Sequence, residues 1–370
     1  MTITVNTICQ AMDSWAPQSL AYEWDKVGLQ IGEPGMPVER VLTCLTITAA
    51  AAARAEQWGA QMIVAHHPIL FSALKTLRTD DPHTRLCLRL AARNIACFAA
   101  HTNLDVVPGG VNTLLAETLG LQKIIPLVPS PKAGQVKLVT FVPETHLATL
   151  REALSQAGAG VIGDYAECTF SSHGTGTFRP GAGANPFSGQ VGKLNEEPEL
   201  RLEILVAKAT LPQALQALRA AHPYEEPACD IVSLENRDAR FGLGARGTLA
   251  RPATLRDFAE SVRQALKLSH VRIVGDPRRK VQRIAVCGGA GGGEIPSIPR
   301  DIDVYVTGDL KYHEADAAQE RGLALIDAGH DGTERNIAAA IAKYLKKVVP
   351  GLEAKAFVET EIFQLVAPPP

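Results

Sequence analysis

The stretch Met62-Ile63-Val64-Ala65-His66-His67-Pro68 places a short apolar strand directly before two histidines and a proline. Strand ends are where α/β proteins hold their ligands. Adjacent residues on a strand point to opposite faces, and the proline biases His67 toward an extended backbone. The two imidazoles can therefore diverge enough to ligate two different metal ions. The alternative is that one of them is a hydrogen-bonded histidine that binds no ligand.

Strand-like and helix-like patterns alternate on both sides of this stretch. In the first 125 residues we expect strands at 41–47, 62–65 and 95–100 and helices at 49–58, 84–93 and 112–119. The last third has the same pattern, with strands at 281–287, 303–307, 323–327 and 356–366 and helices at 313–321 and 333–347. Strands that alternate with single helices indicate βαβ units, so the predicted fold class is α/β with largely parallel sheets.

The middle of the chain carries a weak internal repeat instead. Each half reads strand, helix, strand: 137–142, 145–157 and 166–170, then 200–207, 211–221 and 229–234. A Gly-, Ser- and Pro-rich stretch at 171–195 predicts a long surface loop between the halves. Two such passes suggest a ferredoxin-like α+β domain inserted into the first domain. The predicted divisions are 1–128 and 241–370 for the split α/β domain and 129–240 for the insertion.

Further metal-ligating side chains follow other predicted strands. Asp105, in His101-Thr102-Asn103-Leu104-Asp105, offers a hard oxygen donor, or it forms the turn that follows. His101 either orients a ligand or is a buried strand-end histidine. His330 and Glu334 stand four residues apart at a helix start, on one face. Glu334 can bridge two metals with its two oxygens, or it complements the helix dipole.

Two other segments are weaker candidates. His313 and Glu314 open a helix after Gly308-Asp309-Leu310 and are candidate catalytic or substrate-facing residues, with helix capping as the alternative. The run Cys287–Gly293 follows a strand and is rich in glycine. It has no Walker lysine and no G-x-G-x-x-G pattern, so a tight turn is favoured over a phosphate site.

The proposed ligand set mixes imidazoles and carboxylates: His66, His67, Asp105, His330 and Glu334. Such a set suits Zn, Fe, Mn or Co better than Ca or a cysteine-based structural zinc. Two such metals about 4 Å apart commonly share a water or hydroxide that acts as the nucleophile in hydrolysis. The sequence therefore predicts a site for two divalent ions.

Bulk properties exclude several classes. The 370 residues allow two or three domains, and the net charge of −2 gives no general attraction to nucleic acid or anionic lipid. No apolar run is long enough to span a bilayer, and Met1–Val5 does not resemble a signal peptide. The seven cysteines form no C-x-x-C pair, which favours reduced thiols and the cytoplasm.

Taken together, the order of motifs resembles the NIF3-like family, whose members are also described as type 2 homologues of GTP cyclohydrolase I. The motifs are His66-His67-Pro68, 101–105, Gly308–His313 and Gly329–Glu334, and Glu23–Gly32 and Val286–Gly291 fit the same family. The resemblance covers about 1–125 and 245–370. The middle resembles the inserted PII- or CutA-like domain of longer members, chiefly through His222–Ala228.

This resemblance implies a dinuclear site in which His67, Asp105 and Glu334 hold one metal and His66, His330 and Glu334 hold the other. It also implies a toroidal homohexamer and hydrolytic opening of the purine ring of GTP by a metal-bound hydroxide. Hydrolysis of another nucleotide or of a phosphate ester is a second version of the same hypothesis.

A different class of function also fits: a hexameric metal-binding scaffold or regulator whose inserted domain binds a small molecule or a partner protein. The first predicted strand ends in Leu45-Thr46-Ile47, where members of the resembled family usually carry an aspartate, and Lys26 stands in place of a usual asparagine. Neither is an expected ligand, so these departures bear on the substrate rather than on the metals.

Overall fold

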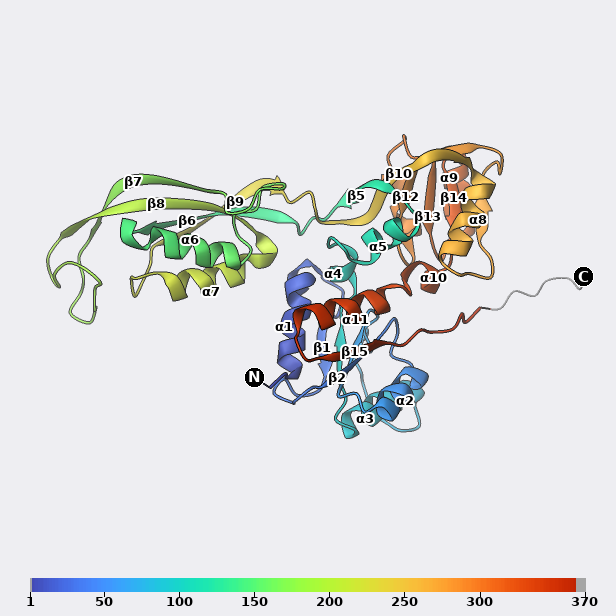
Figure 1. Cartoon of the computed structure of the whole chain (residues 1–370), viewed down its shortest axis with the longest axis horizontal. Coiled ribbons are helices and arrows are strands. Elements are labelled where there is room, and N and C mark those ends of the chain that lie inside the picture. The colour runs from blue at the N-terminus through green and yellow to red at the C-terminus, as the bar shows by residue number, and fades with distance from the viewer. Residues whose placement is uncertain (1, 364–370) are drawn as a thin grey trace, which may run out of the picture. The chain divides into compact units, whose positions relative to one another are not determined.

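The computed structural model describes residues 2–363 and divides into two compact units (Figure 1). The outer unit is built from the two ends of the chain, up to residue 130 and from residue 240 onward. The middle unit is residues 131–239. No helix among the described residues is both long and apolar enough to cross a membrane.

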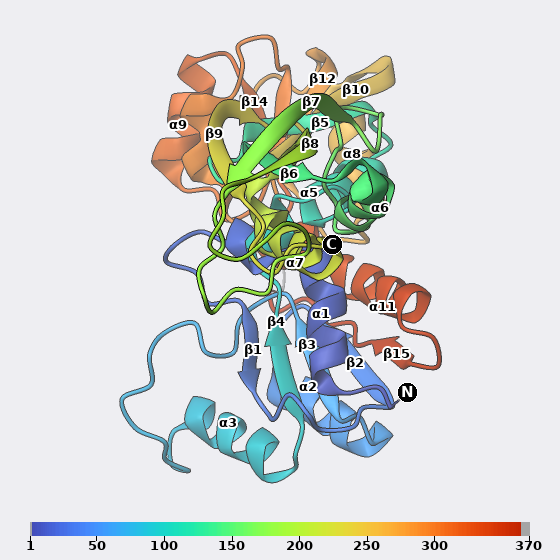
Figure 2. The same cartoon turned by 90° about the vertical axis from the view of Figure 1, so that its left-hand side faces the viewer.

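The first sheet of the outer unit has the order β1-β4-β3-β2-β15. Its strands are β1 (Gly28–Ile31), β2 (Arg40–Cys44), β3 (Met62–Ala65), β4 (Ala96–Ala99) and β15 (Glu353–Ala356). All neighbours are parallel except the edge pair β1–β4. Figure 2 shows β1, β4, β3 and β2 side by side. The helices of this half are α1 (Val5–Trp15), η1 (Gln18–Leu20), α2 (Ala49–Trp58), α3 (Pro82–Ala92), α4 (Thr102–Asp105) and α11 (Ile337–Val348).

Strand alternation explains how this sheet is covered on both faces. Leu42 and Ile63 share one hydrophobic cluster with alanines of α2 and with Leu90 of α3. On the other side, α11 contacts β2 and β15, and α1 contacts α11. Burial on both faces is typical of parallel strands, which read as continuous apolar runs.

The second sheet of the outer unit has the order β11-β14-β13-β12-β10-β5. Its strands are β5 (Gln122–Pro129), β10 (Gly242–Thr254), β11 (Arg272–Val274), β12 (Lys280–Val286), β13 (Val304–Thr307) and β14 (Ala324–Asp327). Only β12, β13 and β14 are parallel to one another, so this sheet is mixed. Its helices are α5 (Val111–Thr118), α8 (Leu255–Ala265), η4 (Gly291–Ser297), α9 (Tyr312–Glu320) and α10 (His330–Glu334). The α/β prediction is thus confirmed, with parallel strands at the centre of both sheets and antiparallel pairs at every edge except that of β15.

Two predictions near the C-terminus were wrong. The helix expected at 333–347 is two helices, α10 and α11. The strand expected at 356–366 is β15, which ends at Ala356; residues 364–366 lie outside the described part. The parallel partner β2 stops at Cys44, and the next N–H groups, of Leu45 and Thr46, donate to the Glu359 carboxylate instead of to a strand. With no partner backbone left, the strand cannot continue.

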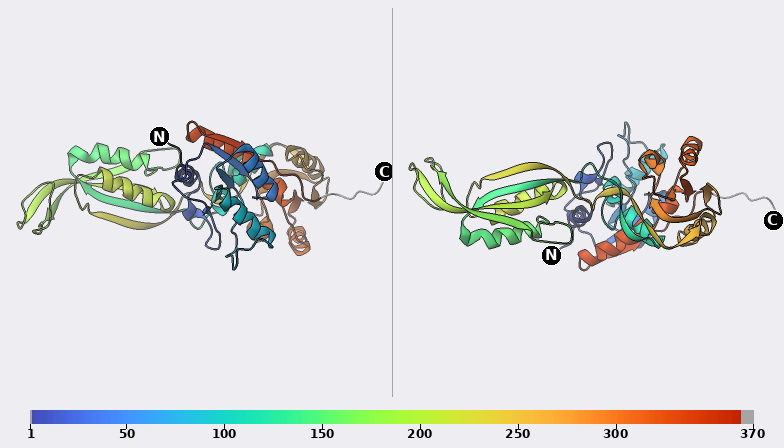
Figure 3. Two further views of the ribbon diagram at one scale, coloured as in Figure 1. Left: turned by 90° about the horizontal axis from the view of Figure 1, so that it is seen from below. Right: turned by 90° about the horizontal axis from the view of Figure 1, so that it is seen from above.

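The middle unit has one antiparallel sheet in the order β7-β8-β6-β9. Its elements run β6 (Gly134–Val142), η2 (Glu144–His146), α6 (Leu147–Gln156), β7 (Thr169–Phe178), β8 (Asn195–Ala207), η3 (Lys208–Thr210), α7 (Leu211–Ala221) and β9 (Cys229–Arg237). The helices share one core with the sheet through Leu138, Leu150 and Leu218. In Figure 3 the β7–β8 pair extends past the ends of both helices.

The loop predicted at 171–195 begins later than expected, because residues 171–178 belong to β7 and only 179–194 form the loop before β8. β7 continues to Phe178, and β8 starts at Asn195. β7 is an edge strand and largely exposed, so Gly, Ser and Thr serve where a buried strand would need apolar residues. Its composition therefore resembled a loop.

The pairing of β5 with β10 predicts that the middle unit can be removed cleanly. Ser130 N–H donates to Phe241 O, and Pro129 pairs with Gly242 across an antiparallel ladder. Replacing residues 131–240 by Asn-Gly joins this pair through a two-residue turn. We expect the shortened chain to unfold in one cooperative thermal transition. A matched variant that also deletes Ser130 shifts the register by one residue and should be clearly less stable. Equal melting of both variants would contradict the pairing.

Candidate metal centre

The five predicted ligands come together in the outer unit. His66 and His67 directly follow β3, Asp105 ends α4, and His330 and Glu334 begin and end α10. They contribute to three groups of side chains whose ligand atoms lie within 4.8 Å of one another: His66, Asp105 and Glu334; His67, His330 and Glu334; and His66, His67 and His101. Each group has the residue types and spacing to hold a metal ion.

The first group contains buried atoms without a hydrogen-bond partner. His66 Nε2 lies 3.6 Å from Asp105 Oδ1 and 3.8 Å from Glu334 Oε1. Within the described chain, His66 Nε2 and Asp105 Oδ1 are both buried and neither makes a hydrogen bond. Unpaired buried polar atoms cost free energy and need an explanation. A divalent cation fits between a neutral imidazole nitrogen and two carboxylate oxygens.

The second group uses the other oxygen of the same glutamate. Glu334 Oε2 lies 3.0 Å from His67 Nε2 and 3.2 Å from His330 Nε2. One carboxylate thus faces both groups, one oxygen to each, as a bridging ligand would.

This grouping differs from the one that the family resemblance implied. There, His67 shared a metal with Asp105, and His66 shared one with His330. In the structure the two histidines exchange places: His66 faces Asp105, and His67 faces His330. The His66 ring is fully buried and His67 is partly exposed, and the two rings are inclined by 42° with their centroids 5.1 Å apart.

One neighbouring group orients each of these histidines through its Nδ1 atom. His66 Nδ1–H donates to the Ala100 carbonyl at 2.7 Å, and His330 Nδ1–H donates to Asp309 at 2.8 Å. His67 Nδ1 is 2.7 Å from the Thr46 hydroxyl. Such contacts fix the tautomer and leave Nε2 free to ligate. Thr46 thus gives His67 a neutral partner, whereas Asp309 gives His330 a carboxylate.

His101 completes the cluster from the side of α4. Its Nδ1–H donates to Asp25 at 2.9 Å, and the same carboxylate accepts from the N–H and hydroxyl of Thr102. Burial raises the pKa of Asp25, but these hydrogen bonds outweigh burial and lower it to about 2. His101 is therefore held beside His66 and His67 by a permanently charged carboxylate.

The other two candidates lie elsewhere. His313 is exposed on α9, and Glu314 accepts the Lys311 N–H at 2.8 Å as part of the helix cap. Neither belongs to the three groups. For Glu314, capping was the alternative reading of the sequence, and the structure supports it.

The glycine-rich run packs against the shared glutamate. A Cβ on Gly289, whose φ is +66°, would lie 2.4 Å from Glu334 Oε1 and 3.2 Å from His330 Nε2. The N–H groups of Gly288, Gly289 and Gly291 already donate to side chains of Asn112, Thr333 and Thr307. The run is therefore a close-approach turn rather than an open phosphate cradle, as its sequence favoured.

Charge in the cluster is arranged to hold cations. Burial lowers the pKa of His66, but Asp105 and Glu334 outweigh it and raise that pKa to about 9. The pKa of His330 is also raised to about 9, chiefly by Glu334. Burial raises the pKa of Glu334, but His330, His66 and His67 outweigh it and hold the pKa well below its usual range. Protons on these histidines and metal ions compete for the same positions.

Sequence reasoning missed the orienting partners. Asp25 and Thr46 lie outside the ligand motifs and were noted only as parts of family-like stretches. For Asp309 no partner was predicted, and its carboxylate holds His330 from a left-handed backbone position with φ of 54°. A non-glycine residue at positive φ is uncommon and often functional. No periodicity in the sequence signals it.

The fold and the cluster define a mixed α/β protein with a candidate metal centre. Comparison with known proteins identifies its family. The Duf34/NIF3 (NGG1p interacting factor 3) family model matches residues 3–364, and the chain belongs to this family. It is 41% identical to a Halalkalibacterium halodurans protein named GTP cyclohydrolase 1 type 2 homolog, over 93% of this chain and 92% of that one. A Bacillus subtilis protein of the same name is 43% identical over 87% of each chain. The crystal structure of a Bacillus cereus protein related to NIF3 matches with a TM-score of 0.87 and 39% identity, covering 99% of this chain and 100% of that one.

Substitution of Gly289 by alanine should move the side chains of the candidate metal ligands out of position. The new methyl group would displace Glu334 and His330 and strain the positive-φ backbone. We expect metal affinity to fall about 10- to 100-fold, as for other changes that misorient ligands. Gly293→Ala is the matched control, because its Cβ would meet no atom within 4 Å. Titration with Mn or Zn checks this, and equal affinity in the two variants would contradict it.

Proposed function

We propose that this chain is a metal-dependent hydrolase that acts on a nucleotide, with ring-opening hydrolysis of GTP as its reaction. The observation that carries the proposal is the buried, unpartnered pair of His66 Nε2 and Asp105 Oδ1 beside the carboxylate of Glu334. An arrangement of this kind is costly to fold and is explained by a cation. The names of the bacterial relatives support the choice of substrate.

Two divalent ions, Zn, Fe, Mn or Co, would be held by the two groups that share Glu334. His66 and Asp105 complete one position, and His67 and His330 complete the other. When bound, such ions polarise a substrate oxygen and lower the pKa of water. The protein's part is to hold the ligands rigidly through their Nδ1 partners. His101 presents its Nε2 to the same cluster and is placed to take up or return a proton during hydrolysis.

The direct test is turnover by metal-loaded protein. We expect hydrolysis of GTP or of another member of a nucleotide panel, and its loss in the His66→Ala/Glu334→Gln double variant. His313→Ala, a change of an exposed histidine outside the cluster, should keep full activity. Equal activity of the wild type and the double variant would rule out hydrolysis at this cluster. Elemental analysis is an independent check, and fewer than one metal per chain after gentle purification would contradict a dinuclear site.

Assembly and location belong to the same proposal. We propose a homohexamer in which the metal centres face an internal cavity, by likeness to the family. We also propose that the protein works in the cytoplasm on a small-molecule substrate, with neither membrane nor nucleic acid as partner. Sedimentation of the purified protein tests the hexamer.

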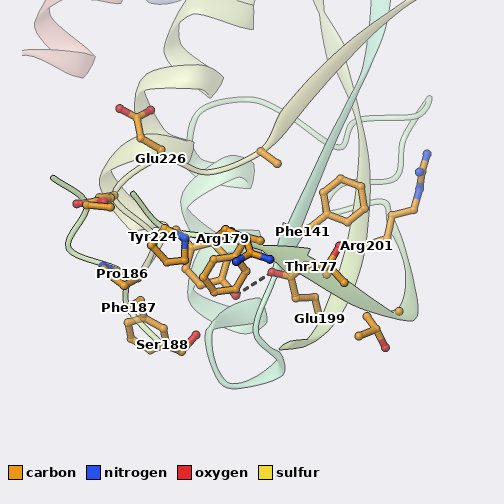
Figure 4. A pocket seen from close by; sticks show the side chains of 18 of the residues that line it. Phe141, Thr177, Arg179, Pro186, Phe187, Ser188, Glu199, Arg201, Tyr224 and Glu226 are labelled. Atoms are coloured by element: carbon orange, nitrogen blue, oxygen red, sulfur yellow. Dashed lines mark hydrogen bonds between the residues drawn. The ribbon is translucent and has the colours of Figure 1, made fainter. Parts of the chain in front are cut away.

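A second candidate function concerns the middle unit. Its order β-α-β-β-α-β supports a ferredoxin-like domain, and we propose that it is the PII- or CutA-like insertion of long family members. A cavity of about 570 Å³ in this unit has the size of a small-molecule site (Figure 4). This observation favours a regulatory role, in which the middle unit binds a small molecule and the metal centre is a structural scaffold.

The motif His222–Ala228 builds one wall of this cavity. Buried His222 Nε2–H donates to Phe141 O, and its Nδ1 accepts from Tyr224 N–H. The Tyr224 hydroxyl donates to Glu199 at 2.8 Å, drawn as a dashed line in Figure 4. Phe187 lies 6.0 Å from Tyr224, centroid to centroid, and is 53% exposed. The wall is thus held in place by hydrogen bonds and offers an aromatic surface.

Charges of both signs line the cavity beside these rings, so we expect it to bind small aromatic molecules, which a panel of both charges would test. Saturation-transfer NMR on the full chain with such a panel should show binding that Phe187→Ala abolishes. Phe170→Ala, which removes an exposed phenylalanine that does not line the cavity, should leave binding intact. Absence of signals, or loss in the control variant instead, would count against this candidate.

A further inference from the structure

We propose that Trp24 and Phe71 form a stacking corner that binds the base of a nucleotide next to the metal cluster. The two side chains come from different loops of the outer unit, one before β1 and one after β3. Trp24 is 55% exposed and Phe71 is 53% exposed. Only 5% of the residues in this chain are aromatic, so large exposed rings at one site are unusual.

The corner adjoins the candidate metal centre through one histidine. The rings of Trp24 and Phe71 lie 6.1 and 6.4 Å from the His101 ring, centroid to centroid, both edge-on. His101 in turn lies 5.1 Å from His66 and 5.7 Å from His67. A ring that rests on Trp24 is therefore separated from the metal ligands by a single side chain.

The geometry of the two rings suits a flat guest. Trp24 and Phe71 are 6.0 Å apart and inclined by 62°. A planar heterocycle can stack on one ring while its edge meets the face of the other, the two arrangements that aromatic groups prefer. Tyr22 stacks on Trp24 at 6.0 Å with an interplanar angle of 10°, and so supports it from one side.

The backbone that carries Trp24 is fixed in advance. Asp25 is buried and binds both His101 and Thr102, and Tyr22 N–H donates to the Thr102 hydroxyl. Trp24 stands between these two anchored residues. The tryptophan is therefore held in place before any ligand arrives, which lowers the entropic cost of binding. Exposed aromatic rings on a fixed backbone are a common way to bind bases.

This inference rests on the proposed function, because it supplies the recognition of the base that a nucleotide hydrolase at this site needs. Its test measures binding rather than turnover, so that the two can fail separately. Calorimetric titration uses the full chain, metal-loaded and after chelation, with GTP, guanosine and inorganic tripolyphosphate as probes.

We expect Trp24→Ala and Phe71→Ala each to weaken GTP and guanosine about tenfold, in the range of base stacking on aromatic side chains, and to leave tripolyphosphate unchanged. Trp24→Phe should restore part of the loss. Tyr165→Ala, which removes an aromatic residue of the middle unit that is 75% exposed, is the matched control and should bind like wild type.

Three results would overturn the stacking corner. The first is failure of the wild type to bind either GTP or guanosine, and the second is unchanged affinity in both alanine variants. The third is a change in sedimentation of these variants without a change in affinity, which would make the corner a contact between copies of the chain. Base binding that depends on Trp24 in a protein without turnover would overturn the hydrolase and keep the corner. Turnover with an unaltered KM in Trp24→Ala would overturn the stacking corner and keep the hydrolase.

Discussion

Glu334 places one buried carboxylate in contact with three histidines at once, and the architecture of the outer unit follows from that constraint. A charge so far from water is tolerable only if positive partners surround it. The three histidines come from two segments, His66 and His67 from the end of β3 and His330 from the start of α10. The glycine-rich turn after β12 lies against the same carboxylate, and any larger residue at Gly289 would collide with it. Segments that follow strands of both sheets of the outer unit thus meet at this one side chain.

Much of this arrangement could be predicted because ligands and buried strands leave strong local signals. His66 and His67 follow an apolar run that is fully buried in the structure, and Glu334 lies one helical turn from His330. The exchange of partners between His66 and His67 could not be predicted, because it depends on how the rings rotate at the strand end. Asp25 and Thr46 were out of reach for a similar reason. Their role arises from contacts 76 and 21 residues away, which periodicity does not record.

The secondary structure shows the same difference: elements set by nearby residues were predicted, and elements set by distant contacts were not. Ala49–Trp58 was predicted to the residue, since an N-capping Thr48 and a left-handed Gly59 define its ends locally. The part of β7 from residue 171 to 178 was mistaken for a loop because an exposed edge strand needs no apolar residues. β15 was misplaced because its end is set by where β2 stops, and that depends on Glu359 taking over two backbone donors.

The place of β15 also has a consequence for how the chain is made. β2 lies between β3 and β15, and β15 is synthesised long after β2, since Glu353 is the residue that pairs with Arg40. Until then β2 presents an open hydrogen-bonding edge, the kind of surface on which nascent chains aggregate. His67 and Glu334 are likewise 267 residues apart in sequence. A nascent chain that stops short of residue 334 has neither the β2–β15 pairing nor the Glu334 carboxylate, so the cluster of histidines and carboxylates can form only after both have been made.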